Sequence, residues 1–403
     1  MSSFFSAKKD IVPLNLVLDI ESGSIGAGLY MNRPGKKPIV LYTARENFVY
    51  QKDLNGQVLF SAMFKALETI LDRIENAGLV GINENKNVLH VIGGYDAVLS
   101  SPWYLSEIKT LKALYATPHQ ISQSSINKLF DTEEREFESK SEISQQNKNA
   151  DPYLLLERKI LRTNLNGYST DKPIGKTARE LELIVAISLT PRVFLEGIKS
   201  AVTRKFPSHQ LGLHTFSLAA FSTIRDIYSQ EDDFIFMHVG GEVTDIVVVK
   251  KGTIADTASF PLGRNTILRD TEKIFSGTPH GALESLVKIA LENKSHSLDL
   301  SKIQIAINDT KTSWLKFFND ALSSFSDKSF LPNTLFFQDN SPFSKIFMEF
   351  LKGAESNRFT VTSQPFSVIA IDASLSKILV DYEKDIVNES SIAVEVNFLS
   401  RLY

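Results

Sequence analysis

Residues 234–262 read FIFMHVGGEVTDIVVVKKGTIADTASFPL, and this stretch decides the fold. An apolar run ends at the pair Gly240-Gly241, and a β-branched run begins at Ile246. A third strand-like segment follows the turn at Gly252. The pattern predicts strands joined by tight turns. A glycine turn between two strands exposes backbone N–H groups with no side chain in the way, as a bound phosphate requires.

A second stretch near the start of the chain has the same character. Residues 14–30 read LNLVLDIESGSIGAGLY: an apolar strand that carries Asp19, a Ser/Gly turn, and a strand of small residues. Two such hairpins, far apart in the sequence, predict two similar half-domains that face one another.

The composition is that of a globular protein large enough for two lobes. The chain has 403 residues, of which 43% are hydrophobic and 23% charged. The net charge of −3 gives no general attraction to nucleic acid or anionic lipid. The chain has no cysteine, which excludes disulfides and thiolate metal sites. Because we find neither a signal-peptide core nor an apolar run of about 20 residues, we expect a cytoplasmic protein.

The apolar spacing predicts a mixed α/β architecture. It predicts a helix over 56–79, a strand over 88–92 and a helical stretch over 105–130, which Pro118 interrupts before a second short helix at 122–130. The polar tract at 131–151 is typical of a solvated loop or helix end. The rest of the chain is predicted to alternate strands and helices: strands over 154–191, helices over 192–205, 213–229, 280–293, 311–325 and 343–352, and a strand over 334–337.

The two hairpins resemble the phosphate loops of the actin-like ATPase superfamily, and most closely those of the cell-division protein family FtsA. The pilus-assembly family PilM is its nearest relative. The family's first loop reads D-I-G-[ST]-[SG], and residues 19–24 here read DIESGS. The second loop reads D-I-G-G-G-T-[TM]-D, and residues 238–245 read HVGGEVTD.

Further segments are similar to FtsA in the same order along the chain. They cover most of residues 14–270, and the similarity fades after residue 280. These segments are HVIGGYDAVLS (90–100), HQISQSSINKLF (119–130), LNGYSTDKPIGKTARELELIVAIS (165–188), LHTFSLAAFSTIRDI (213–227) and ASFPLGRNTILRDTEKIF (258–275).

The resemblance implies a two-lobed actin-like (ribonuclease H-like) fold with an FtsA-type inserted subdomain. It places the first part of lobe I at 1–87, the inserted subdomain at 88–190, the return to lobe I at 191–230 and lobe II at 231–403.

The resemblance also implies a Mg-ATP site with the phosphates between the two loops. Asp19 matches the first-loop acid and is the candidate Mg²⁺ ligand, because Mg²⁺ prefers carboxylate and water oxygens. A turn-capping role for Asp19 is the alternative. No catalytic residue is assigned. The candidate nucleotide-binding residues are Asp19, Ser22, Gly23, Ser24, Gly240, Gly241, Thr244 and Asp245.

Several positions depart from the family pattern at this site. Glu21 and Glu242 replace glycines, His238 replaces the second-loop acid, and Arg264 stands where a second glycine is usual. A glutamate about 4 Å from a phosphate costs on the order of 4 kcal/mol at an effective dielectric near 20. A neutral imidazole is also a poor Mg²⁺ ligand. The adenosine loop, expected after residue 337, has no glycine pair. These departures predict a vestigial or weak nucleotide site.

The favoured hypothesis is therefore a scaffold of the FtsA/PilM type, a pseudo-ATPase that acts through protein–protein assembly. The implied partners are a tubulin-like division protein or pilus and envelope components, at the inner face of the membrane, and self-assembly is compatible with this role. One alternative is an active, polymerising ATPase with Mg²⁺ held by Asp19 and Asp245. A small-molecule kinase of the same fold is the third. The tail at 390–403 is predicted to be a final strand, with a short membrane anchor as the alternative.

Overall fold

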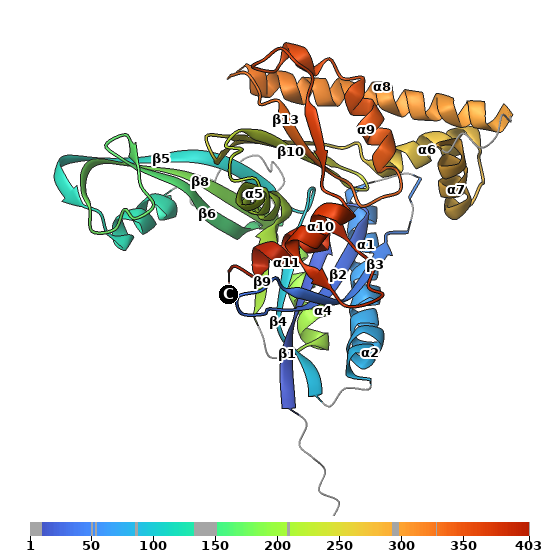
Figure 1. Ribbon diagram of the computed structural model, residues 1–403, viewed down its shortest axis with the longest axis horizontal. Coiled ribbons are helices and arrows are strands. Elements are labelled where there is room, and N and C mark those ends of the chain that lie inside the picture. Colours follow the sequence, from blue (N-terminus) through green and yellow to red (C-terminus); the bar gives the residue numbers. More distant parts are fainter. Residues whose placement is uncertain are drawn as a thin grey trace, which may run out of the picture.

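The computed structural model shows a molecule built around three β-sheets (Figure 1). It describes residues 10–49, 51–52, 55–84, 88–132, 151–207, 210–291, 298–327 and 329–402. The first two sheets each carry one of the glycine-turn hairpins, and the third extends to one side (Figure 1). The predicted mixed α/β class is confirmed.

The first sheet has the strand order β15-β3-β2-β1-β4-β9. Its strands are β1 (Asp10–Ile20), β2 (Ser24–Met31), β3 (Ile39–Asn47), β4 (Val88–Leu99), β9 (Leu211–Thr215) and β15 (Asp381–Tyr382). β1 and β2 form the predicted hairpin, and β4 lies parallel to β1. Because side chains alternate along a strand, Leu16 and Leu18 enter one core while Val17 enters another.

Helices cover both faces of this sheet. One core contains residues of α1 (Gly56–Arg73), the π-helical turn η1 (Ile74–Leu79), α2 (Val80–Asn83) and α4 (Arg192–Lys205). The other contains residues of α5 (Phe216–Ile227), α10 (Ala373–Leu379) and α11 (Ser390–Leu399). α1 begins where the side chain of Asn55 accepts the N–H of Val58, and its buried stripe matches the predicted helix over 56–79.

The second sheet has the order β12-β11-β10-β13-β14. Its strands are β10 (Phe234–Val239), β11 (Thr244–Lys250), β12 (Thr253–Phe260), β13 (Thr334–Gln338) and β14 (Ser367–Ala370). Helices α6 (Arg264–Ile274), α7 (His280–Leu291), α8 (Leu298–Ser326) and α9 (Ser344–Lys352) cover one face, and a short 3₁₀ turn, η2 (Ser356–Arg358), follows α9. Trp314 of α8 is fully buried there and stacks on Phe318. On the other face Phe236 and Val247 pack in the core that contains α5.

The third sheet has the order β5-β8-β6-β7 and forms an arm at the side of the molecule (Figure 1). Its strands are β5 (Leu105–Gln120), β6 (Tyr153–Leu165), β7 (Tyr168–Ser169) and β8 (Thr177–Pro191). The turn between β6 and β7 falls at Asn166 and Gly167, both with positive φ, a conformation that this dipeptide adopts readily in hairpins. The sheet packs Leu181 and Leu183 against the helix at 123–132.

The prediction of a helix before Pro118 is wrong, whereas the second short helix predicted at 122–130 is confirmed. Residues 105–120 form β5, which pairs with β8 along most of its length, and the helix covers only 123–132. The apolar residues spaced three apart lie on the two faces of a strand: Ile108 packs toward the core that contains α5, and Leu111 packs toward the short helix. Long-range pairing has overridden the local pattern.

The strand predicted for the tail is also wrong. Residues 390–399 form α11, in which every side chain except that of Asn397 is buried. A helix that is apolar on nearly all sides belongs in a core. Its apolar side chains contact α5 and β1, so the protein itself covers them. Among the described residues, no helix is both long enough and apolar enough to cross a membrane.

The predicted lobe boundaries stay a prediction: 1–87, 88–190, 191–230 and 231–403. The structure differs in one respect, because residues 381–399 lie with the first sheet. β15 pairs with β3 there, and α11 packs on β1. Most of the polar tract at 131–151 falls on residues 133–150, which are outside the described part of the chain.

Glu395 in α11 provides a test of this packing. Its side chain is fully buried, and its carboxyl group faces that of Asp19, to which it can donate a hydrogen bond when it is protonated. Burial, with the nearby Asp19 charge, raises the pKa of Glu395 well above its usual range. A raised pKa stabilises the fold only while the proton stays bound, so this contribution is lost as pH rises.

We therefore expect Glu395→Gln to stabilise the protein by about 1 kcal/mol or more at pH 8, with a smaller gain at pH 5. Urea unfolding at the two pH values measures the difference. Glu383→Gln, at an exposed position outside the core, is the control and should change little. A variant that is less stable than the native protein at pH 8 would show that α11 needs the carboxylate.

Candidate functional site

The structure brings the two predicted phosphate loops into direct contact. A Cβ atom on Gly23 would lie 2.7 Å from the Cα of Gly241, and a Cβ on Gly241 would lie 2.4 Å from the Cα of Gly23. Both distances are far inside van der Waals contact, so only glycine fits at either position. The predicted glycines are brought together as expected, but no space for a phosphate remains between these two atoms.

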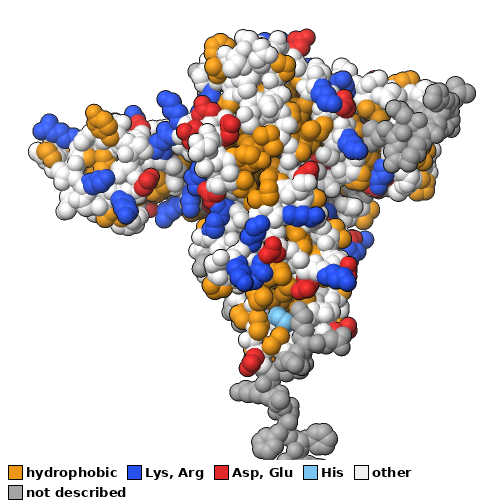
Figure 2. All heavy atoms as spheres, viewed as in Figure 1, with side chains coloured by type: hydrophobic (Ala, Val, Ile, Leu, Met, Phe, Trp, Pro, Cys, Tyr) orange, Lys and Arg blue, Asp and Glu red, His pale blue; other side chains and the backbone are white. Residues whose placement is uncertain are grey.

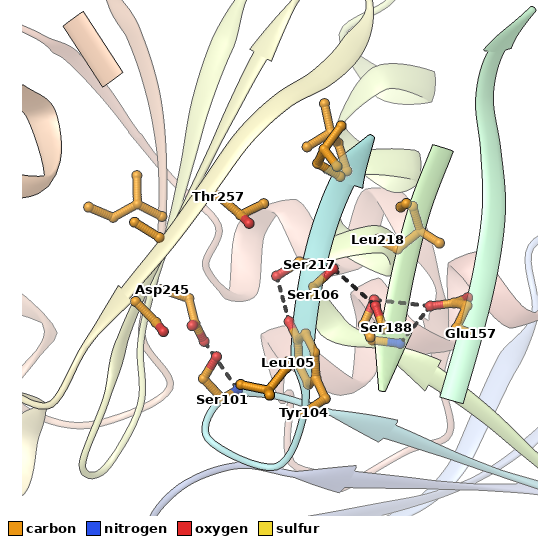
Figure 3. Close-up of a pocket in the computed structure, with 17 residues that line it drawn as sticks. Ser101, Tyr104, Leu105, Ser106, Glu157, Ser188, Ser217, Leu218, Asp245 and Thr257 are labelled. Carbon is orange, nitrogen blue, oxygen red and sulfur yellow. Dashed lines mark hydrogen bonds between the residues drawn. The ribbon is translucent and has the colours of Figure 1, made fainter. Parts of the chain in front are cut away.

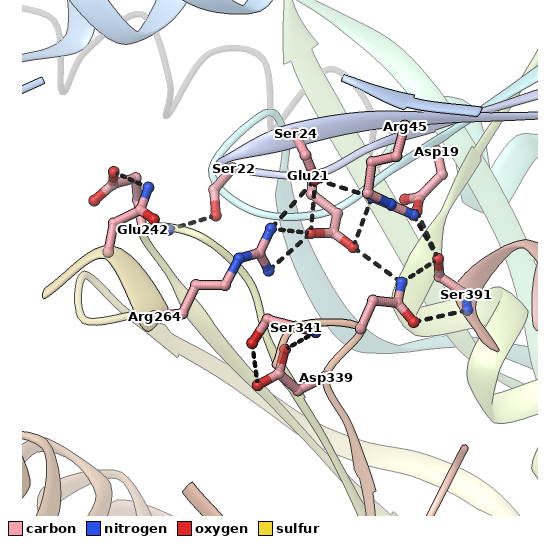
Figure 4. A network of polar contacts seen from close by, with 12 residues as sticks. Asp19, Glu21, Ser22, Ser24, Arg45, Glu242, Arg264, Asp339, Ser341 and Ser391 are labelled. Atoms are coloured by element: carbon pink, nitrogen blue, oxygen red, sulfur yellow. Dashed lines mark hydrogen bonds and ion pairs between the residues drawn. The ribbon is translucent and has the colours of Figure 1, made fainter. Parts of the chain in front are cut away.

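Ser22 satisfies the backbone groups that a phosphate would need. Its hydroxyl oxygen accepts the N–H of Glu242 at 2.9 Å and the N–H of Val243 at 3.2 Å (Figure 4). Backbone N–H groups of this kind form the anion-binding concavity of a phosphate loop. A side chain of the first hairpin therefore occupies the donors of the second hairpin.

Glu21 forms buried ion pairs with two arginines. Its carboxylate lies 3.1 Å from a guanidinium nitrogen of Arg264 and 3.3 Å from one of Arg45 (Figure 4). Burial opposes ionisation of Glu21, but the two guanidinium charges outweigh it and lower the pKa to about 2. Glu21 and Arg264, two of the departures from the family's glycines, are thus partners of one another.

Asp19 is also neutralised within the protein. One carboxyl oxygen accepts from Arg45 at 2.6 Å and from the hydroxyl of Ser391 in α11 at 2.7 Å. Arg45 also contacts Glu389 at 2.6 Å. A guanidinium at this distance occupies the position that a cation would take, so the donor set does not fit Mg²⁺. In the described part of the chain, no group of three His, Cys, Asp or Glu residues could hold a metal ion.

Glu242 points away from the first loop and toward α6 (Figure 4). Its two carboxyl oxygens accept from Arg269 at 2.6 and 3.1 Å, and one also accepts from Asn265 at 2.8 Å. Thr244, predicted to face the nucleotide, donates to the carbonyl of Leu262 at 2.7 Å and accepts from the Trp314 indole at 3.1 Å. These contacts give Thr244 a structural role.

The second loop's histidine is a buried core residue. The ring of His238 packs on Phe216, and its Nδ1 contacts Gln338 of β13. Asn340, two residues beyond, donates to Ser391 and lies 3.5 Å from Glu21. The segment after residue 337, which has no glycine pair for an adenosine loop, therefore contributes polar side chains that contact His238, Glu21 and Ser391.

Two small pockets flank the closed loops. A pocket of about 150 Å³ is lined by Gly23, Arg45, Arg264 and neighbouring residues. Ligand pockets for nucleotide-sized molecules usually exceed about 300 Å³. Asp245 instead lines a different pocket, beside Ser101 (Figure 3). Asp19, which pairs with Arg45, is not among the residues that line this second pocket.

The sequence did not identify the cationic partners of the site. Arg45 lies in a strand and had no motif to mark it, and Ser391 belongs to a helix that was predicted to be a strand. One signal was available for Arg264: an arginine and a glutamate replace glycines in the same site, and such a pair of opposite charges can compensate.

Substitution of Gly23 tests the loop contact. We expect Gly23→Ala to destabilise the protein by about 1–3 kcal/mol, because the added Cβ would overlap the backbone of Gly241. Gly81→Ala is the matched control, since a Cβ in that helix meets no atom within 4 Å. Chemical denaturation measures both. If the two variants were equally stable, the loops would not be in contact in solution.

A double-mutant cycle tests the Glu21–Arg264 pair. Either Glu21→Gln or Arg264→Gln should cost about 3 kcal/mol, and the double variant should cost less than the sum. The folded-state pKa of about 2 means that the contribution of Glu21 is complete above the ordinary pKa of 4.5 and is lost as pH falls toward 2. Glu21→Gln should therefore flatten the acid limb of the stability profile. Additive single effects would argue against the pair.

Comparison with known proteins shows that this chain is similar in fold to solved structures. No protein-family model matches the sequence, and no curated protein does. A solved PilM–PilN type IV pilus biogenesis complex contains a chain with a TM-score of 0.64 and 12% identity, covering 96% of this chain and 98% of that one. A Bacteroides thetaiotaomicron protein with an actin-like ATPase fold and unknown function has a TM-score of 0.42 and 7% identity, over 92% and 93%. The ethanolamine utilization protein EutJ from Carboxydothermus hydrogenoformans has a TM-score of 0.40 and 10% identity, over 96% and 89%. The chain has the actin-like ATPase fold.

Proposed function

We propose that this protein is a PilM-like actin-fold scaffold that does not use ATP and that acts by binding protein partners in an envelope-assembly complex. The observation that carries the proposal is the direct contact between the two phosphate-loop hairpins, with Gly23 against Gly241 and the Ser22 hydroxyl on the N–H groups of the second loop.

The energetics of the site support the loss of nucleotide binding. A phosphate between the loops would have to separate Gly23 from Gly241 and displace the Ser22 hydroxyl. It would also lie close to the Glu21 carboxylate, and like charges at about 4 Å repel by on the order of 4 kcal/mol at an effective dielectric near 20. Breaking the buried Glu21–Arg264 pair would cost about 3–5 kcal/mol more.

Internal contacts supply a bridge that a ligand would otherwise provide. Arg264 follows the second hairpin and reaches Glu21 of the first, and Asn340 reaches Ser391. These contacts connect the end of the second sheet to the first sheet and to α11. A fixed relation between the two halves suits a scaffold, because a rigid surface loses less conformational entropy when a partner binds.

The third sheet is the proposed partner surface. Its free end exposes Leu114, Tyr168 and Ile174, whose relative exposures are 78%, 81% and 58%. Hydrophobic and Lys or Arg side chains are scattered over this arm (Figure 2). Side chains at the exposed end of this arm are accessible to a protein partner. The solved PilM chain is in complex with PilN. By analogy, we propose a pilus or envelope component as partner, with the protein at the inner face of the membrane.

The alternatives require a different arrangement of the acids. A polymerising Mg-ATPase would need Asp19 and Asp245 at one metal ion, whereas Asp19 pairs with Arg45 and Asp245 lies beside Ser101. A small-molecule kinase would need an acidic base and two open phosphate loops. A division role with a tubulin-like partner would use the same scaffold, but the likeness to PilM favours the envelope complex.

A thermal-shift titration with Mg-ATP tests the proposal. A ligand with a Kd of 1 μM would stabilise the fold by about 4 kcal/mol at 1 mM. We expect no saturable shift with Mg-ATP or Mg-ADP beyond that seen with MgCl₂ and sodium phosphate. Sedimentation with and without ATP should likewise show no nucleotide-dependent filaments. Saturable stabilisation at micromolar ATP would overturn the proposal.

A further inference from the structure

A second pocket, distinct from the closed loops, lies where the third sheet meets α5 and the strands β11 and β12 (Figure 3). Its volume is about 210 Å³. Much of its wall is built of hydroxyl groups: Ser188 donates to Ser106 at 3.0 Å, and Tyr104 and Ser217 share a hydrogen bond of 2.9 Å. The pocket is therefore rich in hydrogen-bond acceptors.

Asp245 is the buried acid of this pocket. Its relative exposure is 7%, and its hydrogen-bond partner is Ser101, whose backbone N–H lies at a long 3.4 Å. Among the described residues no lysine or arginine forms an ion pair with it. His238 is the nearby group that favours its charge, but burial prevails and raises the pKa of Asp245. An ionised carboxylate can accept about four hydrogen bonds, so Asp245 can accept further hydrogen bonds from a ligand.

The other carboxylate of the pocket is already compensated. Glu157 accepts the backbone N–H and the hydroxyl of Thr215 at 3.1 and 3.0 Å, and it lies 3.4 Å from His214. Burial disfavours the charged form of His214, but hydrogen bonds to Asp96 and Glu157 outweigh it and raise its pKa to about 9. The uncompensated negative charge of the pocket is thus at Asp245.

We propose that this pocket binds a primary alkylammonium group. An ammonium ion is a compact charge with three N–H donors, which matches one carboxylate surrounded by hydroxyl acceptors. The apolar side chains of Ile108, Leu218 and Ile254 line the same pocket and would contact the alkyl chain. Two sources share this chemistry: a free small amine and a lysine side chain of a protein partner. The proposal does not depend on whether ATP binds.

The probe is n-butylammonium chloride, titrated into the full-length protein and followed by ligand-observed NMR. We expect saturable binding in the millimolar range, as for a ligand of five heavy atoms. 1-Butanol lacks the charge and tetramethylammonium lacks the donors, so neither should compete. Asp245→Asn should weaken binding at least tenfold. Glu107→Gln, an exposed acid on the same arm, is the matched control and should leave binding unchanged.

Circular dichroism checks that Asp245→Asn folds, and Ser106→Leu gives a second variant that fills the pocket and should also abolish binding. The peptide acetyl-Gly-Lys-Gly-amide distinguishes the two sources. Tighter binding than butylammonium, abolished by acetylation of the lysine, would assign the site to a partner's side chain; binding of the free amine alone would assign it to a small molecule. Equal binding to Asp245→Asn, or no saturable binding to the native protein, would overturn the proposal.

Discussion

The contact between Gly23 and Gly241 is the constraint on which the centre of the molecule depends. Two backbone turns can approach this closely only when neither residue has a side chain. The approach brings the Ser22 hydroxyl onto the N–H groups of the second loop and sets Arg264 beside Glu21. A single steric condition therefore places the hydrogen bonds and ion pairs that join the two hairpins.

The central carboxylates are each paired with an arginine inside the protein. Glu21, Asp19 and Glu389 face Arg45, and Arg264 adds a second cation. An unpaired buried charge is costly, whereas a fully paired network is tolerated and specifies one geometry. The same glutamate that would repel a triphosphate thus becomes favourable once arginines replace the ligand. Two facing hairpins are thus joined by buried ion pairs and hydrogen bonds.

Features set by local sequence were predictable, and those set by distant contacts were not. The hairpins followed from apolar runs and glycine turns, and Gly23 and Gly241, which the sequence placed in the two loops, lie against one another. The Glu21–Arg264 pair joins positions 243 residues apart, so no local pattern reveals it. The helix predicted for the residues of β5 was wrong because pairing with β8 overrode their helical spacing. The strand predicted for the residues of α11 was wrong because this alternating sequence is buried on all sides. Asp245 lines a pocket beside the third sheet, and the sequence could not predict this because the pocket depends on how that sheet packs against β11 and β12.

The position of α11 has a consequence for how the chain folds. β1 begins at Asp10, yet the helix that covers Val17 ends at Leu399. During synthesis the first sheet stays partly uncovered until the residues of α11, which end at Leu399, have left the ribosome. Closing so long a loop is entropically costly and slows folding. In the interval the exposed apolar face is open to aggregation and to chaperones. The emergence of α11 therefore sets the time at which the first sheet can become native.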